Sequence, residues 1–174
     1  MIATGKCVLH QSSDSTGVSG VSGTVIFEWD ETEEVLIKGT ISGLSPGKHG
    51  LHVCSFGNIT DGYFHSGDHY NPCDKKHGGP QDEERHVGDL GNVEASDSGV
   101  AEFQMHDRLL RLAGNYSVIG RTLVVTENED DLGKGGDEQS LTTGNAGKGL
   151  AWGIIGIVSE FCPASEDLTQ KSKE

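Results

Sequence analysis

The sequence predicts an all-β protein, built as an antiparallel sandwich or barrel, and three observations support this class. Helical periodicity is nearly absent along the chain. Short stretches rich in β-branched residues recur instead, separated by turns that draw on 26 glycines. Within these stretches apolar residues often fall at every second position, which is the pattern of a sheet with one face in water.

Six segments carry this strand pattern in order along the chain: residues 21–29, 35–41, 50–56, 100–105, 121–126 and 153–158. Alternate residues of a strand point to the same side of a sheet, so the first two segments each present one apolar face. The residues on these faces are Val25, Phe27 and Trp29, then Val35, Ile37, Gly39 and Ile41.

Two long segments interrupt the strands, and we expect both to be ordered functional loops. Residues 57–86 are rich in His, Gly, Asp and Pro, and residues 127–148 read ENEDDLGKGGDEQSLTTGNAGK. Loops beyond about 15 residues are uncommon inside a compact domain unless they carry a site or are tied down. The length of 174 residues indicates one domain over residues 1–162, with a polar and flexible extension over residues 163–174.

The charge and the cysteines limit the partners and the compartment. Thirteen Lys+Arg against 27 Asp+Glu give a net charge of -14, which disfavours nucleic acid and anionic membranes as partners. No apolar run approaches the roughly 20 residues of a spanning helix, and the first residues lack a signal-peptide core. Four scattered cysteines, Cys7, Cys54, Cys73 and Cys162, favour reduced thiols. We therefore expect a cytoplasmic protein.

A metal site is indicated by His69, His77, His86 and Asp89, which follow the spacing H-x7-H-x8-H-x2-D. Three imidazoles and one carboxylate can close a tetrahedron around zinc without leaving an open position, as a structural site requires. Such a site would anchor the first long loop. The alternative is that these histidines are separate surface residues.

A second metal signal is the segment HGLHVCSFG, in which His52 and Cys54 alternate on a predicted strand and so face the same way. Together with His69 they would offer two imidazoles and a thiol, a ligand set that suits soft or borderline ions such as copper. The alternative is a small buried thiol beside a packed histidine.

Residues 6–158 resemble the copper/zinc superoxide dismutases through four motifs: HGLHVCSFGN, GDHYNPCDKKHGGPQDEERHVGDLGNV, GRTLVVTENEDDLGKGG and TGNAGKGLAWGIIGI. The resemblance implies a flattened eight-stranded Greek-key barrel, in which the two long segments are a zinc loop and an electrostatic loop. It also implies that His69 bridges zinc and copper, and that His77, His86 and Asp89 complete the zinc shell. Asp130 would join the copper-side His52 to the zinc-side His77.

The copper side departs from the family, which uses four histidines there. This chain keeps His52 and His69, whereas Cys54 and Thr126 occupy the other two positions. The family's anion-binding arginine falls at Gly149, next to Lys148, and its steering lysines fall at Asn128 and Thr142. The cysteines of its disulfide fall at Tyr63 and Trp152, which cannot form that bridge.

These departures predict a zinc-stabilised homologue with little or no dismutase activity, which acts by binding a metal, a copper chaperone or an active homologue. Zinc is the expected cofactor, and copper is doubtful. One alternative is a dismutase of reduced activity that holds copper through His52, Cys54 and His69, with His65 as the nearest spare imidazole. Another is a thiol redox sensor at Cys54.

A homodimer is also expected from the resemblance. The residues that it places near the dimer contact are Gly57, Ile119, Gly153, Ile154, Gly156 and Ile157. The alternative is that they serve ordinary strand packing.

Overall fold

The computed structural model describes residues 3–10, 20–29 and 34–160. The extension expected at residues 163–174 and the thiol of Cys162 lie outside these ranges. None of the helices in the described ranges is long and apolar enough to cross a membrane.

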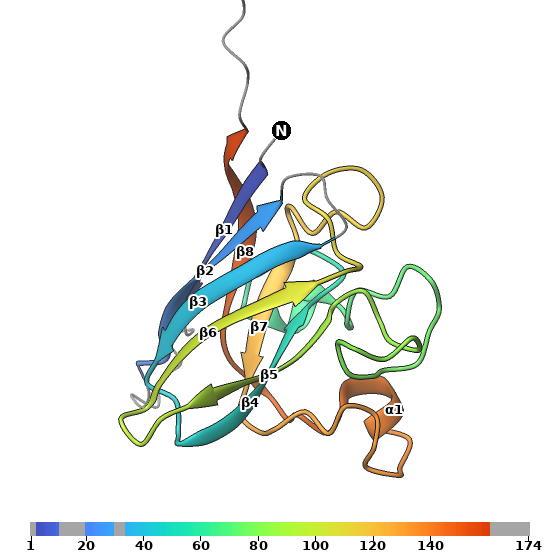
Figure 1. Cartoon of the computed structure of the whole chain (residues 1–174). Helices are drawn as coiled ribbons and strands as arrows, with labels where there is room; N and C mark the ends of the chain where they lie inside the picture. The colour runs from blue at the N-terminus through green and yellow to red at the C-terminus, as the bar shows by residue number, and fades with distance from the viewer. Residues whose placement is uncertain (1–2, 11–19, 30–33, 161–174) are drawn as a thin grey trace, which may run out of the picture.

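Eight antiparallel strands form a single sheet that curls into a nearly closed barrel (Figure 1). The strands are β1 (Ala3–His10), β2 (Ser22–Trp29), β3 (Val35–Ser42), β4 (Gly47–Val53), β5 (Asp89–Ala95), β6 (Val100–Asp107), β7 (Thr122–Thr126) and β8 (Gly149–Glu160). Their order in the sheet is β5-β4-β7-β8-β1-β2-β3-β6. The all-β, eight-stranded prediction is therefore confirmed.

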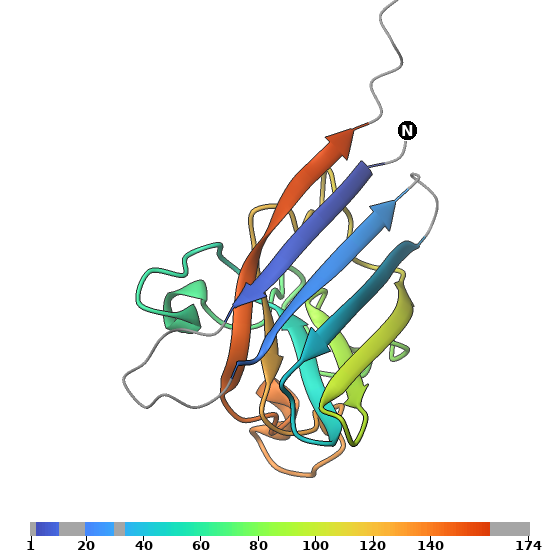
Figure 2. The same cartoon turned by 90° about the vertical axis from the view of Figure 1, so that its left-hand side faces the viewer.

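The strand order produces the Greek-key pattern, because two connections cross between the halves of the barrel. Strands β1, β2 and β3 are neighbours in sequence and in space, and Figure 2 shows them side by side with β8. After β3 the chain crosses to β4, which pairs with β5 and β7, and after β6 it crosses back to β7.

Six of the eight strands overlap the segments with a strand pattern, and two strands lacked a recognised pattern. Strand β1 buries Cys7 and Leu9 and exposes the residues between and after them, yet it is short of β-branched residues. Strand β5 begins with Asp89 and contains Gly91 at φ 74°, so neither its composition nor its backbone is typical of a strand. Strand β4 begins earlier than expected, at Gly47, and ends at Val53.

The core lies inside the barrel and contains the apolar faces anticipated for β2 and β3. Val25, Phe27, Val35, Ile37 and Ile41 are all fully buried. Burial of each such side chain stabilises the fold by about 1.5–3 kcal/mol. Both long loops connect strands of this barrel and are anchored to it at both ends.

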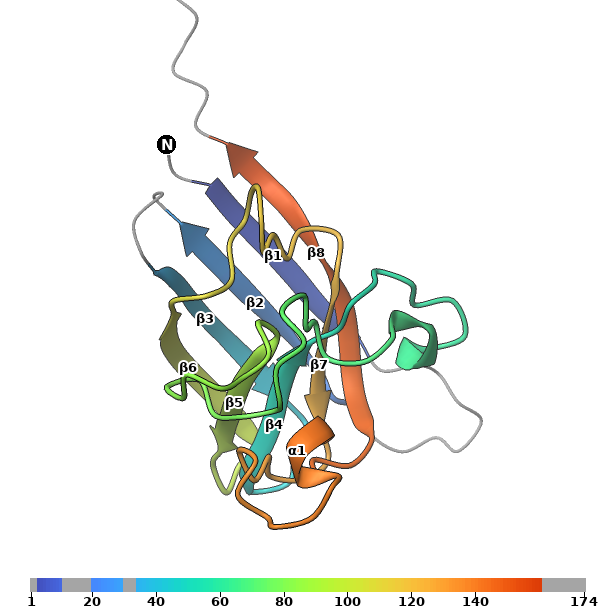
Figure 3. The ribbon, with the colours of Figure 1, turned by 90° about the vertical axis from the view of Figure 1, so that its right-hand side faces the viewer.

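The two long loops leave the barrel on the side shown in Figure 3. The first connects β4 to β5 and contains the short 3-10 helix η1 (Tyr63–Ser66); the second connects β7 to β8 and contains α1 (Ser140–Thr143). They meet where the His77 amide donates to the Leu141 carbonyl at 2.9 Å. Both loops are thus ordered, as predicted.

Candidate metal centre

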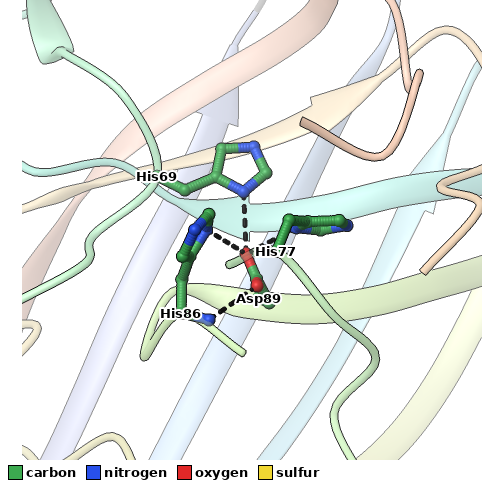
Figure 4. Close-up of side chains that lie close together, drawn as sticks. All are labelled: His69, His77, His86 and Asp89. Carbon is green, nitrogen blue, oxygen red and sulfur yellow. Dashed lines mark hydrogen bonds and ion pairs between the residues drawn. The ribbon is translucent and has the colours of Figure 1, made fainter. Parts of the chain in front are cut away.

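Four side chains converge beneath the first loop, and they are the four predicted from the spacing (Figure 4). His69 is fixed by an isolated β-bridge with Cys54, whereas Asp89 is the first residue of β5. His77 and His86 lie on the part of the first loop that runs from His69 to Asp89. Ligand atoms of all four residues lie within 4.8 Å of one another, and all four side chains are buried.

The geometry centres on one carboxylate oxygen. Asp89 Oδ1 lies 2.8 Å from His69 Nδ1, 3.0 Å from His77 Nδ1 and 3.1 Å from His86 Nδ1. The edges of a zinc tetrahedron measure about 3.3 Å when the bonds are about 2.0 Å long. The three distances from Asp89 Oδ1 are therefore close to the edges of such a tetrahedron. The other oxygen, Asp89 Oδ2, accepts from the backbone amides of His86 at 2.8 Å and Gly78 at 3.2 Å, which fixes the carboxylate plane.

One buried atom in this group lacks a hydrogen bond, and it points to a metal. His77 Nδ1 lies near Asp89, but the angle does not allow a hydrogen bond, and the atom has no other partner. The opposite nitrogen, His77 Nε2, donates to Asp130 Oδ1 at 2.7 Å. Since Nε2 holds the proton of a neutral ring, Nδ1 is left with a lone pair directed at the cluster. A buried lone pair of this kind fits a metal ion.

The cluster strongly perturbs the ionisation of its members. Burial opposes the charge on Asp89, yet hydrogen bonds from His69 and His86 and the close approach of His77 hold the pKa of its carboxyl far below the usual range. Burial also opposes the charge on His77, but its hydrogen bond to Asp130 and the negative charges of Asp130 and Asp89 raise its pKa to about 9. In the metal-free chain a proton thus takes the place that a cation would fill.

Asp130 has its own supports, which sequence reasoning did not identify. Its backbone amide donates to Asn92 Oδ1, and Asn92 Nδ2 donates to its carbonyl, both at 2.8 Å. Gly144, at φ 65°, passes so close that a Cβ there would lie 2.0 Å from Asp130 Oδ1 and 2.5 Å from His77 Nε2. Only glycine leaves room for the Asp130–His77 contact. Among the described residues Asp130 makes no hydrogen bond to His52.

The residues expected on the copper side include two imidazoles, those of His52 and His69. The rings of His52 and His69 stack, with centroids 4.0 Å apart and an interplanar angle of 19°. Burial and the neighbouring His69 lower the pKa of His52 well below its ordinary value, so its ring is neutral. Cys54 is buried in its bridge with His69 but lies outside the group of four ligand residues.

Comparison with known proteins agrees with this arrangement. The family model for copper/zinc superoxide dismutase (SODC) matches residues 21–155. "Superoxide dismutase [Cu-Zn] A" of Xenopus laevis is 51% identical over 157 residues, which cover 90% of this chain and 97% of that protein.

The chain belongs to the copper/zinc superoxide dismutase family. The family implies sites for zinc and copper, and the His/Asp group described above is one that could hold zinc.

The residues that the resemblance led us to expect in place of family site residues have contacts of their own. Thr126 Oγ1 lies 3.2 Å from the carbonyl oxygens of Gly50 and Asn128. The Gly149 amide donates to Tyr63 Oη at 2.8 Å. Lys148 is exposed, and its ammonium lies 3.9 Å from a carboxylate oxygen of Glu127.

Proposed function

We propose that this protein is a zinc-stabilised dismutase homologue with little or no dismutase activity, and that it acts by binding rather than by turnover. The observation that carries the proposal is the contrast between its two sides. The zinc side offers three imidazoles and a carboxylate whose ligand atoms all lie within 4.8 Å of one another. The copper side retains only His52 and His69 as imidazoles, and superoxide chemistry needs copper to be held in both oxidation states.

Thr126 supports the proposal because its hydroxyl already has backbone partners. It lies 3.2 Å from the carbonyl of Gly50 in β4 and from that of Asn128, which follows β7, and it can donate its single proton to either. A neutral hydroxyl is a weak ligand for copper compared with imidazole. To bind an ion, Thr126 would have to give up these contacts.

Cys54 supports it as well. Burial, with a contribution from the nearby Asp68 charge, raises the pKa of the Cys54 thiol to about 12. The thiolate is the form that binds metals and reacts with oxidants. At neutral pH this residue is therefore a protonated thiol inside the barrel end, and it differs from the imidazole that it replaces.

The direct test is the dismutation rate of the copper-loaded, zinc-replete protein. We expect a rate at least about 100-fold below that of an ordinary family member, because several groups that act together are missing. The double variant Cys54→His/Thr126→His is the matched control, and it should gain the electron paramagnetic resonance spectrum of a four-nitrogen copper site. A parent rate close to that of an ordinary member would refute the proposal.

The second candidate is a dismutase of reduced activity that holds copper through His52, Cys54 and His69. The Cys54–His69 β-bridge favours it, because residues opposite each other in an antiparallel pair carry their side chains on the same face. Copper bound by a thiolate has an intense charge-transfer band. Spectra of copper-loaded parent and Cys54→Ala separate the cases: loss of the band in the variant supports this candidate, and identical spectra remove Cys54 as a ligand.

A thiol redox sensor at Cys54 is the least supported function. The residue is 1% exposed, and its raised pKa leaves almost no thiolate near neutral pH. Rapid modification of Cys54 by a thiol reagent in the folded zinc form would revive this function.

We further propose that binding takes place through a dimer, as is typical of this family, either with a second copy or with an active homologue. Strand β8 exposes Ile154, Ile157 and Val158, and β1 exposes Val8. Register places Val8 across from Ile154, so these two belong to one apolar surface. Sedimentation at micromolar concentration tests the homodimer. Copper-delivery proteins that serve active relatives are further candidate partners, and the cytoplasm is the proposed compartment. The charge of -14 argues against nucleic acid and anionic membranes as partners.

A further inference from the structure

Tyr63 links the first long loop to the start of β8 through contacts that the zinc site does not use. Its phenol oxygen accepts a hydrogen bond from the Gly149 amide at 2.8 Å. Its ring lies 5.1 Å from the ring of Trp152, centroid to centroid, at an angle of 50°. Figure 3 shows the loop swinging out beside β8, so the contact ties a projecting segment to the barrel wall.

The hydrogen bond falls where the sheet itself is irregular. Gly149 is opposite Thr126, and the register of β7 with β8 shifts between Val125 and Thr126. A backbone amide beside such a shift needs a partner outside the regular ladder, and Tyr63 Oη provides it. Tyr63 therefore completes the β8 end of the sheet next to a position where the family has a copper-binding histidine.

The same contact leaves no space for a side chain at position 149. A Cβ atom added to Gly149 would lie 2.8 Å from Tyr63 Cε1, 3.0 Å from Tyr63 Cδ1 and 2.9 Å from Val124 Cγ1. Carbon atoms without a bond between them prefer separations of about 3.5–4.0 Å. Both neighbours would have to shift. Val124 is fully buried in β7, whereas Tyr63 is half-buried on a loop and makes two of the three close contacts, so Tyr63 would have to move furthest.

We infer that Tyr63, supported by Trp152, is an aromatic latch that holds the first loop on β8 and closes position 149 to every side chain. An arginine at position 149 therefore cannot be regained by one substitution, because it requires the latch to open. The latch also ties the loop without a covalent bond. This inference goes beyond the proposed function, since it holds whether or not copper binds.

The first test is amide hydrogen exchange in the zinc-loaded, full-length protein. Tyr63→Phe keeps the ring but removes the acceptor, so the Gly149 amide should exchange roughly 3- to 10-fold faster, whereas the amide of Ala151 should not change. His65→Ala is the matched control, because His65 is an exposed neighbour in the same short helix. An unchanged Gly149 rate in Tyr63→Phe would overturn the latch.

The second test measures the steric part by a double-mutant cycle on melting temperature. Gly149→Ala should lower the melting temperature by about 3 to 10 °C in the parent, because the added methyl group overpacks the site. With Ala at position 63, the same change should cost less than half as much. Equal losses in both backgrounds would show that Tyr63 does not close position 149. If Tyr63→Ala does not fold, Tyr63→Phe still decides the hydrogen-bond part.

Discussion

Zinc binding should compete with a single proton on His77, and this competition can be changed at Asp130. In the metal-free chain the Asp130 carboxylate accepts from His77 Nε2 at 2.7 Å, and with Asp89 it raises the pKa of His77 to about 9. Zinc requires the neutral imidazole. Because this pKa is raised above that of a free histidine, the proton is retained until the pH rises through about 9, and zinc must displace it at lower pH.

The size of the effect follows from the pKa. At pH 7 only about 1% of the metal-free protein would have a neutral His77, so the apparent zinc affinity should be about 100-fold below its high-pH limit. Between pH 9 and pH 7 it should fall about tenfold per pH unit, with about one proton released for each zinc bound near pH 7.5. Asp130→Asn removes the carboxylate charge, so the pKa of His77 should return toward about 6.5 and this slope should flatten.

Asp130→Asn also weakens the orientation of His77, which costs about 10- to 100-fold in affinity at high pH. The affinities of parent and variant should therefore converge as the pH falls from 9 to 7. Competition with a chromophoric chelator at several pH values measures the affinities, and a pH indicator in weak buffer counts the protons. Glu129→Gln is the control, since Glu129 contacts Lys48 on the surface of the same loop. A constant ratio of affinities over this pH range would refute the reasoning.

Three further predictions concern stability and reactivity. Chelation of zinc should lower the melting temperature and speed amide hydrogen exchange in residues 57–86, because free zinc at about 1000 times its dissociation constant stabilises the fold by about 4 kcal/mol. A calorimetric melting temperature that responds to neither chelator nor mild acid would count against the site. Arg85→Met should lower the free energy of unfolding in urea by about 3–5 kcal/mol, because it removes the cation that lies 2.7 Å from the buried Asp107 carboxylate and leaves that charge only two backbone amides. A loss below about 1 kcal/mol would contradict this. Cys54 should resist thiol labelling at pH 8 because it is buried and its pKa is raised to about 12, whereas the exposed Cys73 should react. Peptide mass spectrometry measures both rates, and similar labelling rates would contradict the view that Cys54 is an unreactive thiol.

The sequence predicted those features that depend on local spacing. The period of two in β2 and β3 indicated their buried faces, and the intervals between His69 and Asp89 indicated one shared site. The eight-strand Greek-key order came from the resemblance, because strand pairing over long distances leaves little trace in a single sequence.

Other features could not be predicted because they depend on residues brought together only by the fold. Asn92 supports Asp130 from 38 residues away, and Tyr63 meets Gly149 from 86 residues away. The burial of Arg85 depends on Asp107 and on three backbone carbonyl groups that accept from its guanidinium. A charged residue in a polar loop otherwise suggests solvent exposure.

The two imidazoles that remain on the copper side both have a reason to be present that does not involve copper. His69 contributes Nδ1 to the zinc group, so that site needs it in any case. His52 stacks on the His69 ring at 4.0 Å, and such packing restricts the orientation in which His69 presents Nδ1. Cys54 and Thr126, by contrast, contribute no atom to the group of four, and neither offers an imidazole ring to stack on His69. The group of four therefore gives both His52 and His69 a role without copper, and their presence alone is not evidence that copper is bound.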